Sequence, residues 1–252
     1  MKYTTSIFLM LLLITCSCAK TSNQDHSLTP DEYLNFGMPD YSKIWSYDDY
    51  RNACDILGDI KATNPLSLPK KSSDRSGMYF DRIINPDNLD FVQDESLSLQ
   101  QKAYKIQSYK HIQEFLIKIY TDLDSTEQYY HRELIDLYIF SISIAQNMLD
   151  IGYQINESVN ENDMVMQSGF PGIQSRYINT VSFILEIQER DSLFEPEDLE
   201  RLSDFLSSSI LLNKDWMEGS AIEDVKQQVQ KLIDNSSSEY VIKQYNNLIE
   251  SL

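Results

Sequence analysis

Two pairs of histidine and glutamate have the spacing at which both side chains could ligate one metal ion. His111 precedes Glu114 by three residues, and Glu127 precedes His131 by four. Side chains three or four positions apart share one face of a helix. In a hairpin turning near Asp124, however, His111 lies thirteen residues before the turn and His131 seven after it. The mismatch is about 9 Å along the axis. We therefore expect ordinary histidine–glutamate pairing and neither a metal nor a cofactor.

The sequence lacks the motifs of the common catalytic centres. Residues 168–172, Ser-Gly-Phe-Pro-Gly, have no strand-turn-helix context for a hydrolase elbow, and no phosphate-binding glycine loop occurs. Paired carboxylates such as Asp122 with Asp124, and Glu197 with Asp198, lie at predicted helix ends, where they interact favourably with the helix dipole. We predict a protein that is not an enzyme, with a hydrolase assembled from distant residues as an alternative.

An acidic segment is the first candidate binding surface. Residues 186–204 carry eight acidic residues against two arginines, a local charge of −6. The acidic residues are Glu186, Glu189, Asp191, Glu195, Glu197, Asp198, Glu200 and Asp204. A solvated corner between two helices would explain this composition. The alternative is a docking face for a cationic protein, such as a toxin that an immunity protein of the cell envelope neutralises, because opposite charge accelerates association.

A basic group is the second candidate surface. Between Pro65 and Asp94, prolines and glycine interrupt the chain and no hydrophobic period is clear. Thirty residues is long for a structureless loop, so we expect packed irregular structure with one or two short helices. The densest cations of the sequence lie here: Lys70, Lys71, Arg75 and Arg82. In an acidic protein such a group is a candidate site for an anionic ligand.

Aromatic residues offer a third candidate surface. The chain has sixteen tyrosines but only two tryptophans. Both side chains combine a flat apolar face with a polar tip, which suits interfaces. Most tyrosines fall on the apolar stripes of predicted helices, so we expect them at the core. The group near the N-terminus that we predict as an exposed binding cluster is Tyr41, Trp45, Tyr47 and Tyr50.

The first eighteen residues resemble the signal peptide of a bacterial lipoprotein. Lys2 is followed by an apolar run over residues 7–14 and then by Thr15-Cys16-Ser17-Cys18. Eight apolar residues cannot span a bilayer that needs about twenty. The resemblance implies cleavage and lipidation at Cys16, which has leucine at position minus three, or at Cys18, which has the smaller preceding residue. Cys16 is the preferred site. The polar residues 19–28 would then form a flexible tether.

Charge limits the partners of the mature chain. The 252 residues carry a net charge of −18, with a pI near 4.4. Phosphate backbones and anionic headgroups repel such a surface, so we expect no nucleic-acid binding, and membrane attachment through the lipid alone.

Helical periodicity dominates the remainder, and no strand is convincing. The clearest unit is a hairpin over residues 97–153, whose second helix carries apolar residues on most sides and no charge from Leu137 to Leu149. Further helices are predicted near 29–37, 47–61, 173–190, 196–210, 219–233 and 236–252. We predict one all-α domain over residues 29–252, an irregular bundle of about seven helices around that hairpin. The sequence shows no fixed repeat period, so we do not predict a solenoid.

Together these features favour a cell-envelope lipoprotein, in the outer membrane and facing the periplasm, with a helical, non-catalytic binding domain. The alternatives are an immunity protein that captures a basic toxin, and a periplasmic small-ligand binder or hydrolase.

Overall fold

A computed structural model describes residues 25–121, 129–158, 169–189 and 194–252. Within these ranges the chain forms nine α-helices, three short 3-10 helices and no strand, which confirms the all-α prediction. The α-helices are α1 (Pro30–Asn35), α2 (Tyr47–Thr63), α3 (Gly77–Ile83), α4 (Leu99–Thr121), α6 (His131–Ser158), α8 (Phe170–Gln188), α9 (Pro196–Asn213), α10 (Gly219–Asn235) and α11 (Glu239–Ser251). The 3-10 helices are η1 (Pro65–Ser67), η2 (Pro86–Val92) and η4 (Lys214–Trp216).

The starts of α1 and α2 follow from local side-chain chemistry. The Thr29 hydroxyl accepts the Glu32 backbone N–H, and the Glu32 carboxylate accepts the Thr29 N–H, so the two residues cap α1 reciprocally. Ser46 and Asp49 form the same capping box at the start of α2. After α1 the chain reverses through Gly37 at a φ of +90°, a conformation that glycine adopts without strain.

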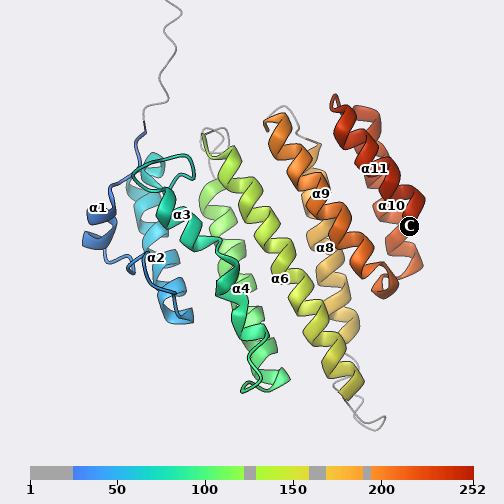
Figure 1. The fold of residues 1–252 in the computed structure, drawn as a ribbon, viewed down its shortest axis with the longest axis horizontal. Helices are drawn as coiled ribbons and strands as arrows, with labels where there is room; N and C mark the ends of the chain where they lie inside the picture. Colours follow the sequence, from blue (N-terminus) through green and yellow to red (C-terminus); the bar gives the residue numbers. More distant parts are fainter. Residues whose placement is uncertain (1–24, 122–128, 159–168, 190–193) are drawn as a thin grey trace, which may run out of the picture.

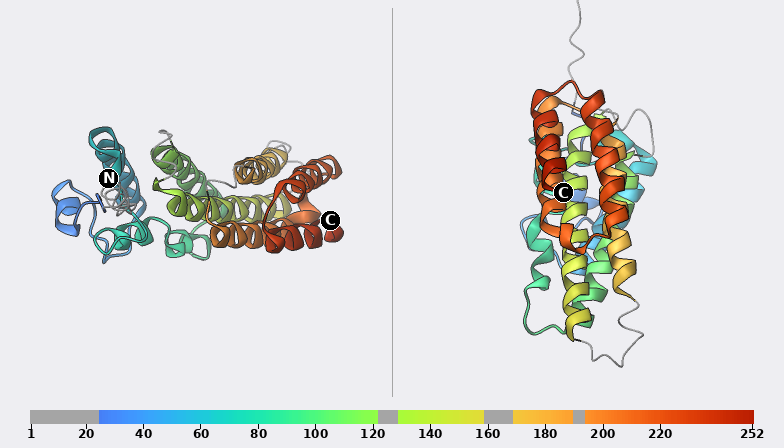
Figure 2. Two further views of the ribbon diagram at one scale, coloured as in Figure 1. Left: turned by 90° about the horizontal axis from the view of Figure 1, so that it is seen from above. Right: turned by 90° about the vertical axis from the view of Figure 1, so that its right-hand side faces the viewer.

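The helices lie in two layers (Figure 1 and Figure 2). One layer contains α4, α8 and α10, and the other contains α6, α9 and α11. Each helix of the second layer packs against its hairpin partner in the first, and neighbours also pack within layers, as α6 does with α9 and α9 with α11. The predicted hairpin 97–153 is therefore the first of three successive hairpins laid side by side, an order that the expected irregular bundle did not anticipate.

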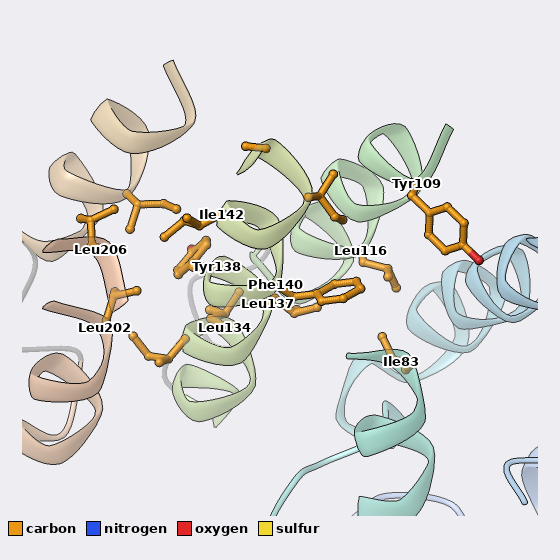
Figure 3. Packing of buried hydrophobic residues seen from close by; sticks show 14 of the residues in the cluster. Ile83, Tyr109, Leu116, Leu134, Leu137, Tyr138, Phe140, Ile142, Leu202 and Leu206 are labelled. Carbon is orange, nitrogen blue, oxygen red and sulfur yellow. The ribbon is translucent and has the colours of Figure 1, made fainter. Parts of the chain in front are cut away.

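Helix α6 is the most enclosed element, because α4, α8 and α9 all pack against it. Fourteen of its 28 residues are buried. In Figure 3 its side chains point toward α9 on one side, where Leu202 and Leu206 lie, and toward Leu116 and Ile83 on the other. Among the described helices α6 alone is long and apolar enough to cross a membrane, yet 67% of its most apolar window is buried inside the protein. Its composition is that of a central core helix.

Three buried tyrosines fix the irregular segment after α2. The Tyr33 hydroxyl donates a hydrogen bond to the Ser67 carbonyl, and Tyr120 donates to the Pro69 carbonyl. Tyr130 has the Pro65 and Leu68 carbonyls within reach of its hydroxyl. These carbonyls lie in the short η1 helix and the loop that follows it, where no α-helical hydrogen-bond ladder is present, and buried carbonyls require donors. Much of the tyrosine content thus serves the core.

The first described residues belong to the folded domain. Ser27 is 2% exposed, and its hydroxyl lies 2.9 Å from that of Ser73. The Ser73 hydroxyl also donates to the Asp25 carboxylate. Residues 25–28 are therefore packed against the loop before α3, and the predicted flexible tether 19–28 is too long at its C-terminal end by these four residues.

Candidate functional site

The proposed lipidation residues Cys16 and Cys18 lie outside the described residues, as do Asp191 of the acidic segment and Glu127 of the second histidine pair. The roles predicted for these four residues therefore remain predictions.

The first histidine pair lies at the surface of α4. His111 Nδ1 is 3.5 Å from Glu114 Oε2, and the other oxygen of Glu114 accepts a hydrogen bond from Lys110. Across the described ranges, no group of three or more histidine, cysteine, aspartate or glutamate side chains could hold a metal ion. The pair that the structure describes is an ordinary contact at the protein surface.

The predicted aromatic cluster is mostly core. Trp45 is 3% exposed and Tyr50 is 1% exposed, while Tyr41 and Tyr47 are half-buried. Tyr50 packs against Tyr109 of α4 with 5.1 Å between ring centroids. The prediction of an exposed cluster is wrong because residues distant in sequence pack on these rings: Tyr109 of α4 on Tyr47 and Tyr50, and Tyr79 of α3 on Tyr41.

The four cations of the predicted anion site have separate partners. Lys71 pairs with the Asp136 carboxylate, and Arg75 lies 3.5 Å from that of Glu32. Arg82 is buried and donates to the Asn88 side-chain oxygen. The fourth, Lys70, has its Nζ 3.6 Å from the centre of the Tyr129 ring. The structure therefore does not bring the four cations to one site.

Asp136 joins the basic group to the acidic segment. Its carboxylate, on α6, is 8% exposed and is bound by Lys71 on one oxygen and by Arg201 of α9 on the other. Arg201 also lies 3.7 Å from Asp198, which in turn lies 3.8 Å from Arg132. Asp136 is not among the predicted site residues, although an acidic residue beside an uncharged stretch of a core helix is a signal that it needs a buried partner.

One turn before Asp136, Glu133 is almost completely enclosed. It is 1% exposed, and one carboxylate oxygen accepts the Lys71 backbone N–H at 2.6 Å. Burial raises the pKa of Glu133 above its ordinary value, and burial likewise lowers the pKa of the nearby Lys70. Both shifts follow from the cost of keeping a charge away from water. Two carboxylates of α6 thus bind Lys71, one through its backbone and one through its side chain.

The acidic segment is partly neutralised by its own fold. Besides Asp198, Glu189 pairs with Lys231 at 2.6 Å, Asp204 accepts the Tyr240 hydroxyl at 2.7 Å, and Glu200 lies 3.5 Å from the Ser238 hydroxyl. Within this segment, three carboxylates have no ion pair or hydrogen bond to the described part of the chain: Glu186, Glu195 and Glu197.

A groove between α4 and α8 combines charged, neutral polar and apolar lining residues. Its volume is about 400 Å³, and residues of three helices line it. The lining residues are Lys110, Glu114 and Ile117 from α4, Ser141 from α6, and Arg176, Asn179, Thr180 and Phe183 from α8. It arises because α4 and α8 occupy the same layer and both pack against α6 (Figure 2). Charged, amide, hydroxyl and aromatic groups therefore face one hollow, which sequence analysis could not assemble.

Two other hollows are less suited to a ligand. A shallow one of about 490 Å³ between α6 and α9 is lined by Asp136, Arg201 and Asp204, which already bind one another or Tyr240, together with Ile139, Phe205 and Ser208. A second, of about 430 Å³, lies beside the first turns of α2 and α4 and is almost wholly apolar, with the exposed Tyr104 at its edge.

These observations define an all-α protein of stacked helical hairpins with a mixed polar and apolar groove. Comparison of the chain with protein-family models, with curated proteins and with solved structures finds no match.

Proposed function

We propose that this protein is a cell-envelope lipoprotein, anchored in the outer membrane through acylated Cys16 or Cys18 and facing the periplasm. Its helical domain binds another molecule and does not catalyse a reaction. The observation that carries the binding role is the groove between α4 and α8. Ligand sites are typically hollows of a few hundred Å³ that combine apolar lining with a few convergent polar groups. The groove fits this description in volume and in lining.

The acidic segment gives weaker support to the alternative partner, a cationic protein, than the groove gives to a small ligand. Capture of a cationic protein would rely on free carboxylates, and only Glu186, Glu195 and Glu197 have no ion pair or hydrogen bond within the described ranges. Binding through them would weaken at high salt, because exposed charges are screened within about 10 Å at 0.1 M. Salt-sensitive binding to a basic protein would favour the immunity-protein alternative.

Two measurements test the proposal. Metabolic labelling with palmitate should acylate the full chain, and replacement of one of Cys16 and Cys18 by serine should abolish the label. A wild-type chain that takes up no palmitate would refute the anchor.

The binding role is tested by filling the groove. Ser141→Phe adds a ring at a lining residue of the groove, while Ser208→Phe adds one at a lining residue of the α6–α9 hollow as a matched control. Small-molecule fractions of the cell envelope should raise the Tm of the wild type and of the control but not of Ser141→Phe. Equal shifts in all three, or none, would contradict binding in the groove. Consumption of the active component, followed by mass spectrometry, would favour a hydrolase.

A further inference from the structure

The charges lining the groove between α4 and α8 are not equivalent. Glu114 is engaged by both Lys110 and His111 on its own helix. Lys110, with 19% of its side chain exposed, is held by the same pair. On the opposite wall, Arg176 is exposed and has no ion pair within the described ranges. Arg176 is therefore the uncommitted charge of this groove.

Neutral polar groups in the groove are also uncommitted. The side chains of Ser141 and Asn179 make no hydrogen bond within the part of the chain that the structure describes. Asn179 follows Arg176 by three residues on α8, so both lie on one face of that helix. An amide and a hydroxyl next to an arginine can complete the hydrogen bonding of an anionic oxygen pair.

The apolar lining is positioned by the core. Phe183 is 47% exposed but contacts Tyr138 of α6 edge to face, with 6.1 Å between ring centroids. This contact holds one side of the Phe183 ring while the other side is open to solvent. Ile117 of α4 contributes aliphatic surface on the other wall. A bound apolar group would be enclosed between the two side chains.

We propose that this groove binds a small amphipathic carboxylate, with Arg176 pairing to the carboxylate and Phe183 and Ile117 covering the apolar body. The planar guanidinium binds a carboxylate through two parallel hydrogen bonds, a geometry that lysine cannot offer. A fixed cation is needed here, because a chain with net charge −18 otherwise repels anions. A cationic ligand would find Glu114 already occupied. This inference rests on the proposed binding role of the groove and adds the chemical class of its ligand.

The probe is 4-phenylbutyrate, with the neutral 4-phenyl-1-butanol as its match. The full chain in lipid nanodiscs, with isotope-labelled isoleucine methyl groups, reports binding through the NMR shift of Ile117. Ile139, which lines the hollow on the other layer, is the internal control. The carboxylate should shift Ile117 and leave Ile139 unchanged, and the alcohol should bind about tenfold more weakly or worse.

Arg176→Gln should weaken binding of the carboxylate by about tenfold or more, without changing binding of the alcohol. The matched variant is Arg51→Gln on α2, since Arg51 is also exposed and has no ion pair in the described ranges. It should bind like the wild type. Arg176→Lys should restore part of the affinity.

Equal binding of acid and alcohol at Ile117, insensitive to Arg176→Gln, would overturn the ligand class while leaving the groove as a binding site. No shift at Ile117 with either probe would overturn this inference, whereas the envelope fractions and the groove-filling variant test the proposed function separately.

Discussion

Replacing Asp136 by asparagine is the sharpest test of how the two predicted charged groups are connected. The amide would keep the shape of the side chain but lose the charge that binds Lys71 and Arg201. Asp136 is only 8% exposed, so water cannot substitute for these partners at the carboxylate itself. The variant therefore leaves two cations facing a neutral group at the boundary between the loop before α3 and helix α9.

The expected cost lies below that of breaking a fully buried ion pair, which is about 3 to 5 kcal/mol. The side chains of Lys71 and Arg201 are 33% and 43% exposed, so water recovers part of their solvation. Asparagine also retains one oxygen that can accept from one of them. We therefore expect a loss of about 2 kcal/mol in the free energy of unfolding, or about 4 to 8 °C in Tm for a domain of this size.

Urea unfolding followed by circular dichroism measures this loss. The control is Glu223→Gln, which removes a surface pair with Lys226 at 3.8 Å and should cost less than about 0.5 kcal/mol. In a double-mutant cycle, Asp136→Asn and Arg201→Gln should be non-additive by about 0.5 kcal/mol or more. An Asp136→Asn variant as stable as the control would refute the view that this ion pair connects the loop to α9.

Further substitutions test other parts of the fold. Between pH 4.5, the ordinary carboxyl pKa, and the raised pKa of Glu133, the folded state keeps a proton that the unfolded chain has lost, so stability falls as pH rises through this window. In thermal melts, the Tm of Glu133→Gln minus the Tm of the wild type should therefore be larger at pH 8 than at pH 4. A side chain at Gly77 would meet a backbone oxygen at 2.9 Å, so Gly77→Ala should cost about 1 to 3 kcal/mol in urea unfolding. Gly172→Ala meets nothing within 4 Å and should stabilise α8 by up to about 1 kcal/mol. Leu137→Ala removes a fully buried side chain and should cost about 2 to 5 kcal/mol by the same measurement, whereas Leu212→Ala, at a residue 75% exposed, should stay within about 0.5 kcal/mol.

Helix positions and core faces could be predicted because they depend on nearby residues. In the hairpin 97–153, Ile112, Leu116 and Ile119 of α4 and Leu134, Leu137 and Ile144 of α6 are buried as their spacing predicts, whereas Phe115 of α4 is 45% exposed. The caps at Thr29 and Ser46 form as the local sequence indicates. Each of these features involves residues within a few positions of one another, where spacing alone decides which side chains meet.

Contacts between distant segments could not be predicted in the same way. Asp136 lies 65 residues from Lys71 and 65 from Arg201, and no local pattern links the three. The groove draws its lining from three helices, so its chemistry appears only once α4 and α8 lie on α6. The aromatic group near the N-terminus was misassigned for the same reason, since the ring that covers Tyr50 belongs to Tyr109.

The tyrosines that hold the segment after α2 have a consequence for the order of folding. Tyr33, Tyr120 and Tyr130 come from three separate parts of the chain, and the hydroxyls of Tyr33 and Tyr130 reach carbonyls 34 and 65 residues away. Contacts of such long sequence separation form slowly, because a large loop must close before any of them is made. The hairpin of α4 and α6 can form earlier from local contacts. We therefore expect the N-terminal segment to dock last. In a newly exported chain, the region next to the proposed membrane anchor would then be the last part to reach its native structure.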